Sequence, residues 1–271
     1  MTMSINNDTN TINVNNNLEI QNRKQYSSLM KLSSGLSIPT AKDDPAGIGI
    51  SDKMNSLIKG LSQYISNAED GISIASTAEG AMQSSTEILQ RMRELSIQAM
   101  NGTLSDSDRT NLQKEIDQLY DEYKNISENT EYNGMKLLDG SFSDNFESVN
   151  SSGQEVNINI EIQDIRFLLD TNINISTVDN AQDSINQIDQ ALNTLSNTRA
   201  DMGSVQYSFE HNINELMTRL ENMSNAKSGI SDLDYSKELS QLNKTEIIKQ
   251  AGIFANKQTK TALEAAYKLL W

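Results

Sequence analysis

The feature that most constrains this chain is an apolar repeat of seven residues that occupies the first half and the last third of the sequence. It is strongest over residues 178–230, where a second apolar series lies between the seven-residue steps. Such a repeat places an apolar stripe along a helix, and two stripes pack together as a coiled coil. The chain is expected to run out along one rod and return along it, so that both termini lie together. We interpret it as a structural protein that acts by assembly.

The N-terminal part divides into helices at local signals. Residues 18–36 carry a helical apolar pattern, whereas residues 1–17 are rich in asparagine and are expected to be disordered in the free monomer. Asp44 suits an N-cap and Pro45 the first position of the next helix. A further helix is predicted from Ser105.

The middle of the chain changes from a helical period to an alternating one. Val156, Ile158, Ile160 and Ile162 alternate with polar residues, which is typical of a half-buried strand. Residues 142–149 are the expected partner strand, with Ser151-Ser152-Gly153 as the turn. The predicted fold class is therefore mainly α, a long antiparallel coiled-coil rod with a small β-hairpin near residues 140–165.

Composition excludes several classes of function. The net charge is −15, which disfavours nucleic acid and anionic membrane surfaces as partners. The chain has no cysteine and one histidine, His211, so neither a metal site nor a cofactor is expected. No enzymatic motif was found, and the chain is expected not to be an enzyme.

The C-terminal segment is apolar on more than one face, so one returning helix cannot cover it. We expect its exposed apolar residues to bind further copies of the chain. If the rotation that relates one copy to the next does not close into a ring, the product is a helical filament. The candidate assembly residues are Leu29, Leu32, Leu36, Ile247, Ile248, Ala251, Phe254, Leu263, Leu269 and Leu270.

Several strings along the whole chain resemble bacterial flagellin. They include Lys31-Leu32-Ser33-Ser34-Gly35-Leu36, Asp43-Asp44-Pro45-Ala46-Gly47, Gln90-Arg91-Met92-Arg93-Glu94-Leu95, Ile230-Ser231-Asp232-Leu233-Asp234 and Gln250-Ala251-Gly252. The resemblance implies a subunit of the flagellar filament, exported through the growing filament and located outside the cell. It further implies an export chaperone, a filament cap and hook-junction proteins as partners. The family's variable outer insert is nearly absent, which indicates a minimal flagellin.

The resemblance also implies a division into domains. The expected inner filament-core domain consists of residues 1–42 and 235–271. The outer coiled-coil domain consists of residues 43–178, with the hairpin, and of the C-terminal helix over residues 179–234.

In flagellins the helix that carries the Gln90–Leu95 string is also recognised by a vertebrate Toll-like receptor. The matching positions here are Arg91, Leu95, Gln98 and Glu115, which are candidate receptor or subunit contacts. Two alternatives to a filament subunit stay open: a hook–filament junction protein, and a secreted coiled-coil ligand of host innate receptors that forms no filament.

Overall fold

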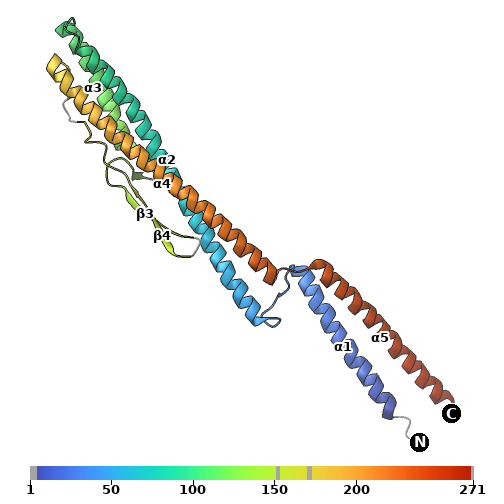
Figure 1. Cartoon of the computed structure of the whole chain (residues 1–271). Coiled ribbons are helices and arrows are strands. Elements are labelled where there is room, and N and C mark those ends of the chain that lie inside the picture. The colour runs from blue at the N-terminus through green and yellow to red at the C-terminus, as the bar shows by residue number, and fades with distance from the viewer. Residues whose placement is uncertain (1–4, 151–152, 170–172, 270–271) are drawn as a thin grey trace. The chain divides into compact units, whose positions relative to one another are not determined.

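The computed structural model describes residues 5–150, 153–169 and 173–269. Its helices are α1 (Ile5–Ser34), α2 (Pro45–Ala99), α3 (Asp106–Asn129), α4 (Val178–Ser231) and α5 (Tyr235–Leu269). Two antiparallel strand pairs lie between α3 and α4: β1 (Glu131–Tyr132) with β2 (Met135–Lys136), and β3 (Ser143–Val149) with β4 (Glu155–Glu161). The predicted fold class, mainly α with a small β-hairpin, is confirmed (Figure 1).

The chain forms two compact units, each built from segments distant in sequence. Unit 1 consists of residues 1–58 and 222–271, and unit 2 of residues 59–221. The domain boundaries expected from the sequence stay a prediction.

The core of unit 2 lies between α2 and α4, which run antiparallel (Figure 1). Two ion pairs fix their register: Arg93 Nε donates to Asp189 Oδ1 at 2.6 Å, and Arg199 Nη2 to Glu79 Oε1 at 2.9 Å. Small and large apolar side chains alternate along α2, with Ala75, Ala78 and Met82 fully buried. This packing is what the seven-residue repeat predicts.

The β3–β4 hairpin packs against α4. The rings of Phe146 and Phe209 meet edge to face, with centroids 5.4 Å apart. Ser148 Oγ donates to Asn212 Oδ1 at 2.6 Å in a buried hydrogen bond, and Arg219 donates to the Asn150 carbonyl at 2.9 Å. The strand predicted over 156–162 and its partner over 142–149 are confirmed within one residue. Ser151 and Ser152 of the expected turn lie outside the described residues.

The helix boundaries of α2 and α3 follow their local capping signals. Asp44 Oδ1 accepts hydrogen bonds from the backbone N–H groups of Ala46 and Gly47, so Asp44 caps α2 as predicted. Ser105 and Asp108 form a reciprocal capping box at the start of α3.

Unit 1 contains the paired helices α1 and α5, which run antiparallel (Figure 1). A short antiparallel backbone bridge between Leu36 and Asp232 joins the segment that follows α1 to the segment that precedes α5. Ser37 N donates to the Ser231 carbonyl at 2.8 Å, and Leu233 N donates to the Gly35 carbonyl at 3.0 Å. Gly35 has a φ of +71°, so α1 ends in the left-handed conformation that glycine adopts without strain.

The start of α1 differs from the sequence-based prediction. The helix begins at Ile5, so the expected disorder is wrong for residues 5–17, while residues 1–4 lie outside the described part. The asparagines lower helix propensity, but tertiary contacts override it. One such contact joins Asn256 Nδ2 of α5 to Asn15 Oδ1, at 2.9 Å.

Candidate assembly surface

The contact line between α1 and α5, here called the seam, is formed by shielded residues spaced three and four apart on each helix. On α1 they are Thr11, Val14, Leu18, Gln21, Gln25, Ser28 and Leu32. On α5 they are Glu238, Leu242, Thr245, Lys249, Gly252, Asn256 and Thr259. The spacing is that of a coiled coil, but most of these side chains are polar or small.

Hydrogen bonds between side chains cross the seam. Lys249 Nζ donates to Gln25 Oε1 at 2.9 Å, one turn from the buried Ser28. At Gly252 the helices come so close that an added Cβ would meet the Leu18 side chain at 2.9 Å. Polar seam positions fix register at the expense of stability, so apolar burial contributes little to holding this pair together.

The large apolar side chains of the pair point to solvent instead. Tyr26 is 67% exposed on α1, and Ile247 and Phe254 are 67% and 70% exposed on α5. Further exposed members are Ile12, Ile20, Leu29, Met30, Leu239, Ile248 and Ile253. Burying each such side chain is worth about 1.5–3 kcal/mol. The seam is thus mostly polar or small, while the largest apolar side chains of the pair lie on its outer surface, unlike an ordinary two-helix coiled coil.

Most of the predicted assembly residues lie on this outer surface. Leu29, Leu36, Ile247, Ile248, Ala251 and Phe254 are exposed, whereas Leu32 is half-buried in the seam. Leu263 and Leu269 belong to α5, but their side chains lie outside the described part, as does the whole of Leu270.

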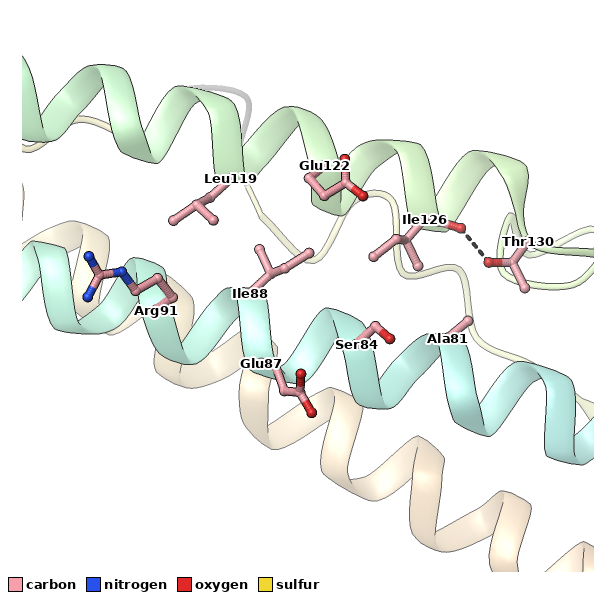
Figure 2. A pocket seen from close by; sticks show the side chains of 9 residues that line it. All are labelled: Ala81, Ser84, Glu87, Ile88, Arg91, Leu119, Glu122, Ile126 and Thr130. Atoms are coloured by element: carbon pink, nitrogen blue, oxygen red, sulfur yellow. Dashed lines mark hydrogen bonds between the residues drawn. The ribbon is translucent and has the colours of Figure 1, made fainter.

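A second surface feature is a groove of about 600 Å³ between α2 and α3 in unit 2. Figure 2 shows Ile88 of α2 facing Leu119 and Ile126 of α3, with Arg91, Glu87 and Glu122 among the polar lining residues. The groove lies beside the residues that the sequence proposed as receptor or subunit contacts.

Three of those four receptor candidates are at the surface. Arg91 Nη2 donates to Glu115 Oε1 at 2.7 Å, and Arg91 Nη1 donates to Glu94 at 3.2 Å. The hydrogen bond with Glu115, followed by that with Glu94, raises the pKa of Arg91 above its ordinary value. Gln98 is also exposed. Leu95 is 1% exposed, so this expected contact is corrected to a residue of the apolar core of unit 2.

The described residues contain no group of three or more His, Cys, Asp and Glu side chains that could hold a metal ion. Within the same ranges, no helix is both long and apolar enough to cross a membrane.

Comparison with known families identifies the chain. The bacterial flagellin N-terminal helical region matches residues 5–143, and the bacterial flagellin C-terminal helical region matches residues 185–264. This chain is a bacterial flagellin. As a flagellin, it is a structural subunit of the flagellar filament.

Curated relatives extend the match over almost the whole chain. The flagellin of Bacillus subtilis is 36% identical over 302 aligned positions, covering 97% of this chain and 99% of the relative. The flagellin of Halalkalibacterium halodurans is also 36% identical, over 276 positions that cover 99% of this chain and 100% of the relative. Flagellin D of Vibrio anguillarum aligns over 374 positions at 30% identity, and this exceeds the 271 residues here. The extra positions are insertions in that relative, in agreement with a minimal flagellin.

Solved structures agree with the fold. The crystal structure of Bacillus cereus flagellin is 30% identical with a TM-score of 0.52, covering 60% of this chain and 94% of that one. A putative flagellar hook-associated protein from Vibrio parahaemolyticus has a TM-score of 0.59 at 16% identity, with 70% and 100% coverage. This second likeness shows the fold alone and does not favour the hook-junction alternative.

Sequence reasoning missed the polar seam. The signal was present, because Thr11, Leu18, Gln25 and Leu32 continue a seven-residue pattern into the asparagine-rich segment. Only the partner helix reveals that these positions, rather than the larger apolar residues, make the contact.

Proposed function

We propose that the flagellin assembles through the outward-facing apolar residues of α1 and α5, which are covered in the filament by the same helices of neighbouring copies. The observation that supports this is the reversed pattern of the pair, with polar residues in the seam and Tyr26, Ile247 and Phe254 in solvent. Burial of those side chains supplies a free energy that a single copy cannot obtain.

A point charge on the outer surface tests this proposal. Ile247→Glu places a carboxylate where a neighbouring copy would bury it, and the cost of desolvation opposes assembly. The critical concentration for filament formation, measured by sedimentation and negative-stain microscopy, is expected to rise at least about tenfold, which corresponds to about 1.4 kcal/mol. Gln241→Glu adds a carboxylate at another exposed position of α5 and serves as the control.

The outcome of this comparison decides the proposal. Equal critical concentrations for the Ile247→Glu variant and the wild type would contradict assembly through this surface. Deletion of residues 240–271 gives a second test, because filaments formed in normal yield without them would refute a role for α5.

We propose that the assembled protein lies outside the cell and is exported through the growing filament, a proposal supported by relatives named flagellin and flagellar filament core protein. An export chaperone, a filament cap and hook-junction proteins are the proposed further partners. Both terminal helices remain available to such partners until assembly, because the apolar residues of α1 and α5 are exposed in the single chain.

Recognition by a host Toll-like receptor is a second proposed role, and it concerns the α2–α3 surface. Arg91, Glu115 and Gln98 present charged and polar groups there, beside the groove of Figure 2. Arg91→Ala is expected to reduce signalling by the monomer in receptor-expressing reporter cells while helicity, measured by circular dichroism, stays unchanged. Glu69→Ala, at another exposed position of α2, is the control, and full signalling by the Arg91→Ala variant would exclude this role.

A further inference from the structure

The loop between α2 and α3 contains one of the two Asn-Gly pairs of the chain, Asn101-Gly102, and the other pair, Asn133-Gly134, lies between β1 and β2. Both asparagines are exposed. An asparagine followed by glycine can react with itself, because the glycine nitrogen can approach the side-chain amide carbon without a Cβ in the way. Nothing lies within 4 Å of a Cβ built on Gly102 or on Gly134, so steric access does not distinguish the two pairs.

Thr103 binds the side-chain oxygen of Asn101 with two donors. Its backbone N–H donates to Asn101 Oδ1 at 3.1 Å, and its hydroxyl donates to the same oxygen at 2.9 Å. Because a backbone N–H can only donate, its partner is the amide oxygen rather than the amide nitrogen. The first bond is that of an Asx-turn, which folds the side-chain amide back toward the backbone that follows. The amide carbon is thus polarised and turned toward the segment that contains Gly102 N.

The backbone carbonyl oxygen of Asn101 also accepts two hydrogen bonds. Arg109 Nη2 donates to it at 3.0 Å, and Leu104 N donates to it at 3.2 Å. This carbonyl belongs to the same peptide group as Gly102 N, and resonance spreads the charge of a deprotonated peptide nitrogen onto the oxygen. The two donors therefore stabilise the anion that forms when Gly102 N loses its proton, and the charged guanidinium does so more strongly than a neutral donor.

The four donors lie where negative charge develops during ring closure. Two bind the oxygen of the peptide group that becomes the nucleophile, and two bind the oxygen on which charge accumulates as the amide carbon is attacked. Fixed donors at such positions lower the barrier in the way that an oxyanion hole does. Because Asn101 is exposed, ammonia can leave and water can enter.

We propose that Asn101-Gly102 is a self-modification site, at which the folded protein accelerates the deamidation of its own asparagine. Gly102 N loses its proton to solvent and bonds to Asn101 Cγ, and the Cγ–Nδ2 bond breaks as ammonia leaves with a proton from solvent. The product is a five-membered succinimide ring. Water then opens one of the two carbonyl–nitrogen bonds of the ring, which leaves aspartate or isoaspartate at position 101.

The modification changes the loop that Arg109 binds. Both products carry a negative charge, and isoaspartate also adds one methylene group to the main chain between the carbonyls of Ala99 and Leu104, to which Arg109 donates. These hydrogen bonds depend on the spacing of the carbonyls along the chain. The isoaspartate form therefore holds the connection between α2 and α3 less tightly.

Asn133-Gly134 is a control within the same chain. Asn133 has a φ of 50° and Gly134 a φ of 80°, which are the positive values that a two-residue hairpin turn requires. In the part of the chain that the structure describes, no hydrogen bond reaches the Asn133 side chain or its carbonyl oxygen. The two pairs thus share their chemistry and their exposure but differ in the donors around the reacting groups.

The rates of the two asparagines in one sample test the proposal. Freshly purified full-length protein is incubated in the folded state and, in parallel, in urea, and conversion is followed by mass spectrometry of tryptic peptides. Arg109 and Lys124 lie between the two sites, so trypsin places them in different peptides. In the folded protein Asn101 is expected to convert at least about tenfold faster than Asn133, the effect of about one hydrogen bond from a charged donor.

Unfolding removes the donors from both sites, so in urea Asn101 is expected to slow and the two rates to converge. Equal rates in the folded protein would overturn the proposal. A difference that persists in urea would overturn it as well, because the cause would then lie in the neighbouring sequence rather than in the fold.

Thr103→Val tests the donors directly. It removes the hydroxyl that binds Asn101 Oδ1 but keeps the backbone N–H. Conversion of Asn101 is expected to slow about two- to tenfold, as for the loss of one hydrogen bond, while conversion of Asn133 stays the same. Thr110→Val makes the same change at an exposed position of α3 and is the matched control. Equal rates at Asn101 in the two variants would overturn the role of the Thr103 hydroxyl.

Discussion

Gly71 of α2 lies directly against the aromatic ring of Phe209 of α4. A Cβ built on Gly71 would come within 2.6 Å of Phe209 Cζ, closer than real atoms approach. Phe209 is 1% exposed and also meets Phe146 of the hairpin, so its ring has no free direction in which to move. In unit 2, α2, α4 and the hairpin therefore come together at Gly71, where α2 has no side chain.

Gly71→Ala is expected to destabilise unit 2 by about 1–2 kcal/mol. Overpacking costs about 1–3 kcal/mol, and the better helix propensity of alanine returns up to about 1 kcal/mol. Gly80→Ala is the matched control on the same helix, because nothing lies within 4 Å of an added Cβ there. The control should gain about 0.5–1 kcal/mol. Urea unfolding followed by circular dichroism measures both, and equal stabilities of the two variants would contradict the tight contact.

Local signals in the sequence were enough to predict much of the fold. The cap at Asp44, the start of α3 after Ser105 and the start of α4 at Val178 depend on residues within one turn. The alternation of β4 likewise predicts its own strand. These features are determined by residues close together in the sequence, so they could be predicted without knowledge of distant partners.

Features that depend on distant partners were not predicted. The helical state of residues 5–17, the polar seam and the burial of Leu95 each follow from which helix lies beside them. Of the candidate site, the sequence identified the exposed apolar residues of α5 but not the polarity of the contact beneath them. The short β1–β2 pair was missed too. Asn133 and Gly134, with φ angles of 50° and 80°, form the turn that joins its two strands.

Arg109, near the start of α3, binds the backbone at the end of α2 and in the loop that follows it. Arg109 is 9% exposed, and its guanidinium donates to three backbone carbonyl oxygens, those of Ala99, Asn101 and Leu104, at 3.0–3.2 Å. Arg109→Met keeps much of the packing but leaves these carbonyls without their charged donor. We expect a loss of about 2–4 kcal/mol in thermal or urea unfolding, from several charge-assisted bonds. Lys114→Met, on an exposed position of α3, should change stability by less than about 0.5 kcal/mol.

The carboxylate of Asp164 makes the stability of unit 2 fall as the pH is lowered into the acidic range. It accepts hydrogen bonds from the Arg166 guanidinium at 2.8 and 3.1 Å, and these lower its pKa below the ordinary 3.8. A carboxyl group with a lower pKa in the folded state stabilises the fold above its unfolded pKa, and that contribution is lost as pH falls through the folded value.

Asp164→Asn removes this dependence. The wild type is expected to be more stable than the variant near pH 6, and the difference should shrink as pH falls below about 4. Urea unfolding at a series of pH values measures it, with Asp201→Asn at an exposed position of α4 as the control. A difference between wild type and the Asp164→Asn variant that stays constant from pH 6 to pH 2 would contradict the role of the Asp164–Arg166 pair.

A double substitution in the polar seam of unit 1 is expected to stabilise the protein, whereas most substitutions destabilise it. Replacing both partners of the Lys249–Gln25 bond by leucine leaves no donor or acceptor unpaired and adds apolar burial between α1 and α5. We expect the Gln25→Leu, Lys249→Leu variant to stabilise the helix pair in the unassembled chain by about 1–3 kcal/mol. Hydrogen exchange of the α5 amides in the monomer measures the gain. Lys24→Leu with Gln241→Leu makes the same change of composition at exposed positions, and it should give no comparable protection. Equal protection in the two variants would mean that the seam is not the contact that limits the stability of the terminal helices.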